Sequence, residues 1–175
     1  MRILLVLLTM IATTATAAPI DGTPPVPEFT NKNPDHWFNS APMKRADLEG
    51  KVVLIDVWTY DCWNCYRSFP WLNALEKQFA GEDFLVVGIH SPEFAHEKEP
   101  DRVAAKIKEF NLHHPVMMDN DFRYWQALNN RYWPAFYLVD RQGRLRHLHV
   151  GETHIGDRRA KAIQRQIRQL LNESD

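Results

Sequence analysis

Residues 52–65 read VVLIDVWTYDCWNC, an apolar run that leads into a pair of cysteines. The part 52–58 is rich in β-branched residues and is interrupted only by Asp56, which is typical of a strand covered on both faces in a parallel sheet. Beyond the cysteines, apolar side chains recur at helical spacing, at Phe69, Leu72, Leu75 and Phe79. The sequence therefore predicts a strand that leads to two thiols at the start of a helix.

Strand and helix patterns alternate through the rest of the chain. The predicted elements are a strand at 84–89, a helix at 100–110, a short strand at 115–118, a helical segment around Phe122, Trp125 and Leu128, a hairpin of strands at 135–139 and 145–150, and a helix at 158–172. Residues 19–27 are rich in Pro and Gly and predict an extended segment that leads into the fold. Residues 29–48 predict an N-terminal edge followed by a turn. Pro70 inside the first helix predicts a kink. This order, which has no internal repeat, indicates one α/β sandwich domain.

The composition indicates a globular domain without a charged partner. The chain has 175 residues, of which 45% are hydrophobic and 25% are charged, the balance of a protein that can bury a core. Its formal net charge is -1, so the overall field favours neither nucleic acid nor an anionic membrane surface. We therefore expect no nucleic-acid partner.

The first residues predict export. Arg2 is followed by an apolar run at 3–8 and then by ATA at 15–17, the order found in a cleavable secretory signal peptide. We expect a signal peptide at 1–17 and a soluble mature domain at 18–175 that is periplasmic or otherwise exported. The alternative, a membrane anchor, would need about 20 apolar residues to cross the hydrocarbon core.

The two cysteines of the chain both fall in Cys62-Trp63-Asn64-Cys65. An exported protein meets an oxidising compartment, where such a pair forms a disulfide. A cysteine at the first turn of a helix meets unpaired backbone N–H groups and the positive end of the helix dipole, which stabilise a thiolate. Cys62 is therefore the predicted nucleophile. Cys65, one turn deeper, is the thiol that displaces a substrate from a mixed disulfide with Cys62.

Asp56 is the candidate proton carrier for Cys65. Burial in an apolar strand should raise the pKa of its carboxyl, so that Asp56 can accept the Cys65 proton directly or through a water. The alternative is a hydrogen-bonded structural aspartate at the end of a strand. Asp61, beside Cys62, adds a negative charge that opposes thiolate formation.

Together with Pro70 and with Trp133-Pro134 before a predicted strand, residues 52–65 resemble the thioredoxin superfamily over nearly the whole mature chain. Three segments are more narrowly similar to the DipZ-like branch of the TlpA family, namely WTYDC at 58–62, GIHSPEF at 88–94 and NRYWPA at 130–135. The resemblance implies a thioredoxin-like domain at 18–175 with the activity of a thiol-disulfide oxidoreductase. Its fold would be a three-layer α/β/α sandwich with a mixed central sheet, a TlpA-type N-terminal extension and an inserted helix and strand.

The same resemblance assigns the site residues. They are a redox-active disulfide and its active-site loop, Cys62, Trp63, Asn64 and Cys65. Pro134 becomes a cis proline that faces the cysteines, and the backbone of Trp133 is then free to pair with an extended substrate segment. The residues alone would equally allow a trans proline at the start of an edge strand.

Partners and cofactors also follow from the resemblance. It implies protein thiols and disulfides of the periplasm as substrates, a membrane thiol-electron donor of the DsbD or CcdA type, and no cofactor. Many TlpA-like reductases carry a proline before the second cysteine and a glutamate three residues after it, where this chain has Asn64 and Ser68. These departures leave the direction of electron flow open, and we favour reduction.

Three alternatives compete with disulfide exchange. A purely structural disulfide would close too short a loop to remove much chain entropy. A thiol peroxidase needs a cation beside Cys62, and only Arg67 is near in sequence. A metal-handling or haem-handling chaperone would bind through its thiols, and five histidines would offer a surface metal site, His113, His114, His147, His149 and His154. No second Cys-x-x-Cys completes a zinc site, and we expect no bound metal.

Overall fold

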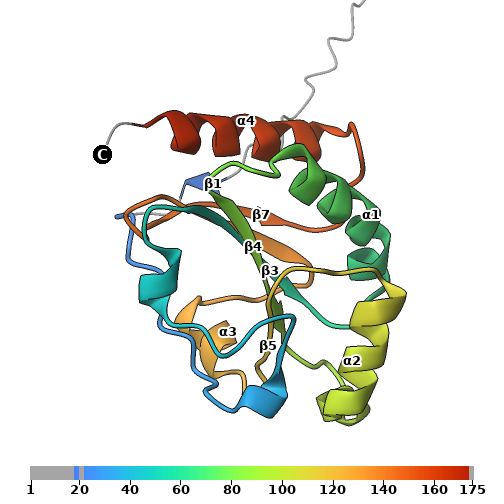
Figure 1. Cartoon of the computed structure of the whole chain (residues 1–175). Helices are drawn as coiled ribbons and strands as arrows, with labels where there is room; N and C mark the ends of the chain where they lie inside the picture. Colours follow the sequence, from blue (N-terminus) through green and yellow to red (C-terminus); the bar gives the residue numbers. More distant parts are fainter. Residues whose placement is uncertain (1–17, 20–21, 174–175) are drawn as a thin grey trace, which may run out of the picture.

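The computed structural model describes residues 18–19 and 22–173, which form a central sheet with helices against it (Figure 1). The strands are β1 (Ala18–Pro19), β2 (Trp37–Phe38), β3 (Val52–Trp58), β4 (Phe84–His90), β5 (Val116–Met118), β6 (Ala135–Val139) and β7 (Leu145–Val150). The α-helices are α1 (Trp63–Gln78), α2 (Pro100–Glu109), α3 (Arg123–Ala127) and α4 (Arg158–Asn172). Short 3-10 helices are η1 (Pro34–His36), η2 (Arg45–Leu48) and η3 (Ala95–Lys98).

Strand β3 lies in the middle of the sheet, whose order is β1-β7-β6-β3-β4-β5-β2. It runs parallel to β4, to which α1 connects it, and antiparallel to β6. All residues of β3 are buried, because strands flank it on both sides and other elements cover both of its faces. The mixed central sheet expected from the sequence is therefore confirmed, with the fully buried strand β3 at its centre.

Successive side chains of β3 enter two different cores. Leu54 and Trp58 pack with residues of α1, α2 and α4 in one cluster. Val53 and Ile55 pack on the opposite face, where the cover comes from α3, η2 and the N-terminal segment. Figure 1 shows the same uneven division, with α1, α2 and α4 on one side of the sheet and mostly irregular chain with α3 on the other. The three-layer thioredoxin-like arrangement is thus present, and the N-terminal extension supplies much of one outer layer.

Most predicted elements match the observed ones within one residue at each end. The strand at 52–58, the hairpin strands and the last helix have the expected bounds, because each has a clear periodic pattern and a turn or cap at its ends. The N-terminal edge is β2, which pairs antiparallel with β5. Helix α1 continues through Pro70, and the kink expected there stays a prediction.

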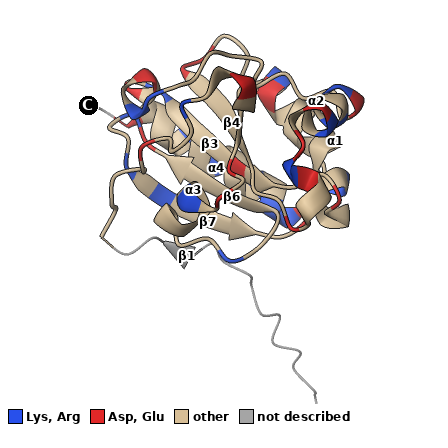
Figure 2. Cartoon of the chain, turned by 90° about the horizontal axis from the view of Figure 1, so that it is seen from below, with Lys and Arg blue, Asp and Glu red and all other residues tan. Residues whose placement is uncertain are grey.

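The predicted signal peptide at 1–17 lies outside the described residues. Within 18–19 and 22–173, no helix combines the length and the apolar character that crossing a membrane requires. Figure 2 shows acidic and basic residues interspersed over the helices and loops of the side in view. This mixture agrees with the small net charge of the chain.

The packing of α4 against the sheet yields a stability prediction. Ile167 is fully buried among α1, α4 and the central strands. Ile167→Ala should lower the free energy of unfolding by about 2–5 kcal/mol, because it removes buried methyl groups and leaves a cavity. Urea unfolding of the oxidised protein measures this change. The exposed Arg165 on the same helix is the control, and Arg165→Ala should change stability by less than about 0.5 kcal/mol. Equal effects of the two substitutions would contradict the described packing of α4.

Candidate active site

Cys62 and Cys65 form a disulfide at the N-terminus of α1, and their Cα atoms are 5.2 Å apart. Cys62 is the N-cap residue of the helix, and its Sγ accepts the backbone N–H of Cys65 at 3.2 Å. Cys65 is buried whereas Cys62 is partly exposed. The sulfur of Cys62 therefore combines access for a substrate with the partial positive charge of a helix end.

Ser68 ties the first turns of α1 to the loop that precedes α4. Its hydroxyl donates to the carbonyl oxygen of Asn64 at 2.7 Å and accepts the backbone N–H of Thr153 at 3.0 Å. Arg67 forms an ion pair with Glu152 of the same loop at 3.2 Å. In the sequence, Ser68 stands out only as a departure from the glutamate of many TlpA-like reductases. No pattern in the sequence indicates its hydrogen bonds to Asn64 and Thr153.

Asp56 projects from β3 into the core shared by α1, α2 and α4, because it lies two residues from Leu54 and from Trp58 and therefore shares their face of the sheet. Its side chain is buried, and neither carboxyl oxygen has a hydrogen-bond partner among the described residues. Burial raises the pKa of Asp56 well above that of an ordinary aspartate, and the negative charge of Glu76 raises it further. The sequence predicted this direction from the apolar context of the strand.

Glu97 is a second buried carboxylate, and the sequence did not reveal it. It accepts backbone N–H groups of Asp61 at 3.1 Å, Glu93 at 2.6 Å and Phe94 at 2.7 Å. The Thr59 hydroxyl donates a further hydrogen bond to the same carboxylate. Glu97 therefore holds the loop before Cys62 against η3. A glutamate in the polar stretch 93–99 has the pattern of an exposed residue, so no sequence signal distinguished it.

Asp61 has a hydrogen-bonded partner in η3. One carboxylate oxygen lies 2.5 Å from Nε2 of His96, and both side chains are partly exposed. The His96 ring therefore engages one oxygen of the carboxylate that stands beside Cys62.

The peptide bond between Trp133 and Pro134 is cis, as the resemblance implied. The indole Nε1 of Trp133 donates to the carbonyl oxygen of Ser91 at 3.0 Å, and its ring packs against Trp125 with centroids 4.3 Å apart. Both Cys62 and Trp133 pack against the core that contains Cys65. The disulfide and the proline loop thus border the same core.

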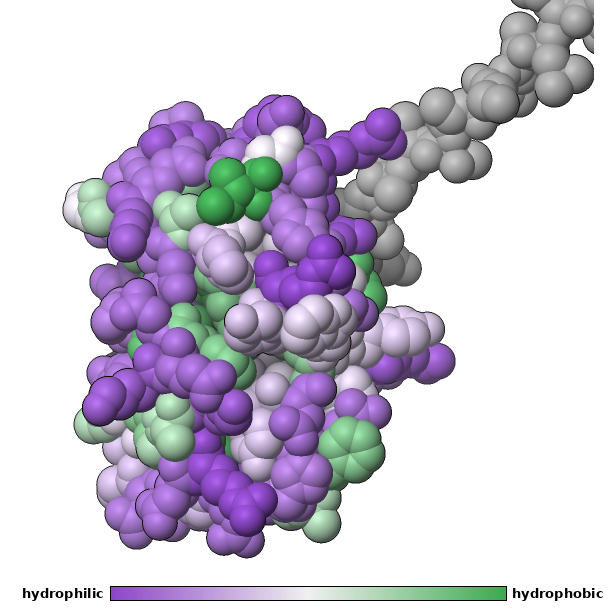
Figure 3. Space-filling view, turned by 90° about the vertical axis from the view of Figure 1, so that its right-hand side faces the viewer, coloured by the Kyte–Doolittle hydropathy of each residue, from purple (hydrophilic) through white to green (hydrophobic). Residues whose placement is uncertain are grey.

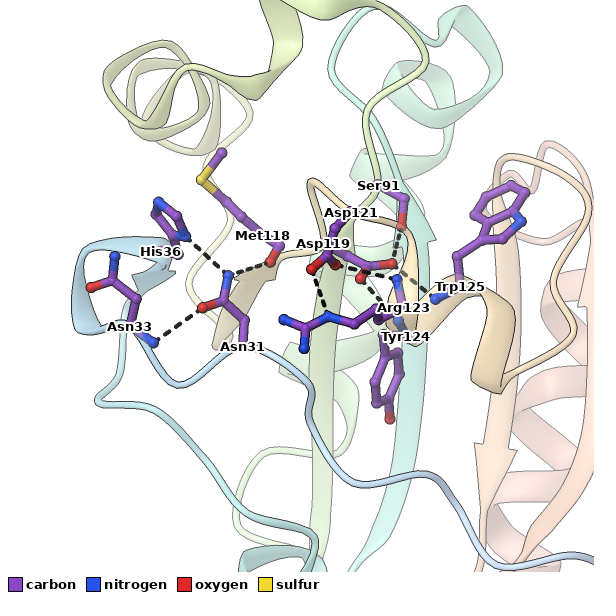
Figure 4. Close-up of polar contacts among 10 residues, drawn as sticks. All are labelled: Asn31, Asn33, His36, Ser91, Met118, Asp119, Asp121, Arg123, Tyr124 and Trp125. Carbon is purple, nitrogen blue, oxygen red and sulfur yellow. Dashed lines mark hydrogen bonds and ion pairs between the residues drawn. The ribbon is translucent and has the colours of Figure 1, made fainter.

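A further buried carboxylate, Asp119, lies among Ser91, Tyr124 and Trp125 (Figure 4). It accepts the backbone N–H groups of Tyr124 at 2.9 Å and Trp125 at 2.8 Å, at the start of α3. The Ser91 hydroxyl donates to it at 3.2 Å. Asp119 therefore joins α3 to Ser91, whose carbonyl oxygen accepts the indole N–H of Trp133. The sequence did not identify this support, because its members lie far apart in the chain.

The histidines considered for a surface metal site do not form one in the described part of the chain. Over residues 18–19 and 22–173, no three His, Cys, Asp or Glu side chains are grouped to hold a metal ion. His114 is buried and bonded to Glu76 at 3.0 Å, and His149 is buried and bonded to Gln166 at 2.7 Å. Each of these two histidines thus has a separate partner within the protein.

Comparisons with known proteins agree with this geometry. The sequence model of the Redoxin family matches residues 22–163. Protein DipZ of Mycobacterium bovis is 39% identical over 141 residues, which are 79% of this chain but 20% of DipZ. This chain therefore spans about a fifth of that relative. The thiol-disulfide oxidoreductase YkuV of Bacillus subtilis is 25% identical over 151 residues, covering 86% of this chain and 97% of YkuV.

Solved structures show the same fold. The crystal structure of a thioredoxin-like superfamily protein superposes with a TM-score of 0.75 at 27% identity, over 86% of this chain and 97% of that protein. The family match includes both cysteines and the cis proline. The chain therefore belongs to the Redoxin family within the thioredoxin superfamily, and its cysteine pair is Cys62 and Cys65.

Proposed function

We propose that this chain is a thiol-disulfide oxidoreductase that is exported and reduces disulfides of protein substrates through Cys62, Cys65 and Asp56. The observation that carries the proposal is the buried carboxyl of Asp56, which has no hydrogen-bond partner within residues 18–19 and 22–173 and lies on the core face to which the buried Cys65 also belongs. Burying a carboxyl without a partner costs free energy. Such a group is retained where a proton must be exchanged, and Cys65 is the group that must lose one.

The reaction starts from the reduced enzyme. The Cys62 thiolate attacks one sulfur of the substrate disulfide, which breaks, and a mixed disulfide forms. Asp56 then takes the proton of Cys65, and the Cys65 sulfur attacks Sγ of Cys62. The substrate leaves with both electrons, its two sulfurs take protons from solvent, and the enzyme retains the Cys62–Cys65 disulfide. A thiol donor must reduce that disulfide before the next turnover.

Exposed apolar side chains support a protein as the substrate. Among the described residues, the exposed large hydrophobic side chains are Trp63, Tyr66, Phe94, Tyr132 and Ile155. Soluble proteins rarely leave such residues grouped at the surface without a binding role. Figure 3, which views the side of α1 and α2, shows pale and green residues gathered within a mostly hydrophilic surface.

Each of these side chains is connected to the disulfide region. Trp63 and Tyr66 stack on each other in the first turn of α1, with ring centroids 5.4 Å apart. Phe94 stacks on His96, the partner of Asp61. Tyr132 lies next to the loop residues Trp133 and Pro134, which form the cis peptide bond. Ile155 belongs to the loop in which the backbone N–H of Thr153 bonds to Ser68. We call these five exposed side chains the apolar rim. They would bind the unfolded or extended segment of a protein, and the backbone of Trp133 would pair with that segment.

Export rests on the N-terminal sequence. The segment 1–17 has the order of a signal peptide, and 18–175 would be the mature thioredoxin-like domain. Both cysteines of the chain lie in the redox centre. In an oxidising compartment, the chain therefore has no other thiol with which they could form a wrong disulfide. A membrane thiol donor, as the resemblance to the TlpA family implies, would be the source of electrons.

The two cysteines should respond differently to substitution. Cys62→Ser should abolish insulin disulfide reduction, because the nucleophile is lost. Cys65→Ser should accumulate mixed disulfides with substrate, because attack by Cys62 still occurs and release does not. Non-reducing electrophoresis after incubation with an oxidised protein detects these adducts. Equal adduct formation by both variants would contradict the assigned roles.

Asp56→Asn should slow substrate reduction at neutral pH by about 10- to 100-fold, because Cys65 loses its proton acceptor. The loss should shrink at high pH, where the Cys65 thiol ionises without help. A rate profile between pH 5.5 and 9 with insulin as substrate measures the effect. A profile that superposes on that of the wild type would show that Asp56 carries no proton in turnover.

The pH dependence of the unfolding free energy tests the raised pKa of Asp56 independently of catalysis. The pKa of Asp56 is raised in the folded protein, so the unfolded chain releases this proton at lower pH than the folded one does. The stability of the wild type should therefore fall as pH rises toward the folded pKa. Asp56→Asn removes this fall. The unfolding free energy of the variant minus that of the wild type should therefore be larger at pH 8 than at pH 4. Urea unfolding of the oxidised forms at both pH values provides the test.

The apolar rim should matter for proteins and not for small disulfides. Replacing both Tyr132 and Ile155 by alanine should raise KM for insulin about tenfold, the effect of losing about 1.4 kcal/mol of contact. KM for hydroxyethyl disulfide should stay unchanged, because that molecule reaches only the sulfurs. Lys161→Ala on the exposed face of α4 is the control. A parallel change for both substrates would argue against a protein-binding rim.

A further inference from the structure

The sheet neighbours of Asp56 differ sharply in character. On β6 its partner is Phe136, whose ring packs edge-on against Trp71 with centroids 5.0 Å apart. On β4 its partner is Gly88, which has no side chain. Residues directly opposite in neighbouring strands share a face of the sheet. The Asp56 carboxyl is therefore closed in by an aromatic ring on one side and has access to polar groups on the side of Gly88.

Unpartnered polar atoms meet over Gly88. A Cβ atom placed on this residue would lie 3.0 Å from Nε1 of Trp58, 3.1 Å from Cγ2 of Val116 and 3.2 Å from Nε2 of His114. Among the described residues, neither nitrogen has a hydrogen-bond partner, and the same holds for both carboxyl oxygens of Asp56. Buried polar atoms in this number are normally satisfied. One water molecule with two to four polar neighbours would satisfy them.

His114 links this buried region to the surface. Its Nδ1 lies 3.0 Å from a carboxylate oxygen of Glu76 on α1. The side chain of His114 is 1% exposed, and that of Glu76 is 25% exposed. A carboxylate that accepts the Nδ1 proton leaves the lone pair of Nε2 directed toward Gly88. The ring can then take a proton at Nε2 and release another at Nδ1.

The other groups nearby are poorer proton acceptors. The indole nitrogens of Trp58 and Trp71 only donate hydrogen bonds. His90 on β4 packs edge-on against Trp58, with ring centroids 4.9 Å apart. Burial lowers the pKa of His90 to about 3, so its ring resists protonation at neutral pH. His114 is therefore the acceptor best suited to receive a proton from Asp56.

We propose that His114 and Glu76 form a proton path between Asp56 and solvent, through a water bound over Gly88. The path rests on the proposed role of Asp56 in the cysteine chemistry. After Asp56 has taken the Cys65 proton, it donates that proton to the water, which gives one of its own to Nε2 of His114. The Nδ1 proton passes to Glu76 and from there to solvent. Asp56 is again a carboxylate and can accept the proton of Cys65 in the next turnover.

His114 acts through Asp56 and does not touch the sulfurs, so its test needs a double-mutant cycle. His114→Gln should slow insulin reduction near pH 7 by about tenfold, with the loss shrinking at high pH. In the Asp56→Asn background, the same substitution should cause no further loss, since the path has no proton to carry. His113→Gln, at the exposed neighbouring histidine, is the matched control and should retain the wild-type profile.

Gly88→Ala provides a second probe if His114→Gln folds poorly, because its methyl group would lie 3.0 Å from Nε1 of Trp58 and 3.2 Å from Nε2 of His114 and would leave less room for a water near them. It should reproduce the loss in the wild-type background and have no effect beside Asp56→Asn. Equal losses in both backgrounds, or no loss from either His114→Gln or Gly88→Ala, would overturn the path. If Asp56→Asn slows turnover while these two do not, the proposed function stands and the path alone fails. If Asp56→Asn is itself without effect, the proposed role of Asp56 fails first.

Discussion

The chemistry of this protein depends on the attachment of two sulfurs to the N-terminus of one helix. Cys62 caps α1, and its sulfur accepts a backbone N–H of the first turn. Helix ends carry unpaired N–H groups that favour a thiolate over a thiol. The helix holds this position because it follows the central strand β3 directly and packs on it through a large apolar face. The sheet thus positions the sulfurs, and the helix end activates one of them.

Three buried carboxylates near this site show how burial can serve structure or chemistry. Glu97 and Asp119 each accept backbone N–H groups, and each ties together loops that border the disulfide. Their hydrogen bonds compensate the cost of burial. Asp56 has no such partners among the described residues, so its position is costly for the fold. That contrast, more than burial alone, separates a group suited to exchange protons from groups that hold loops in place.

Prediction from the sequence worked where the evidence was local. The strand at 52–58 and the helix after it follow from runs of apolar residues at fixed spacing, and the cysteine motif lies at their junction. The direction of the Asp56 pKa followed from one acidic residue in an apolar strand. The cis bond at Pro134 was different, because residues alone allowed either isomer and only the resemblance to a family favoured cis.

The sequence by itself determined the order of strands and helices, the location of the thiols at a helix start and the burial of Asp56. These features depend on neighbours in the chain, which periodicity and capping rules describe. Only the tertiary structure decided that Glu97 bonds to Asp61 and that His114 lies over Gly88. These contacts join segments far apart in the chain, and they arise from the order of strands in the sheet. A polar residue in a loop carries no pattern that reveals which distant strand will bury it.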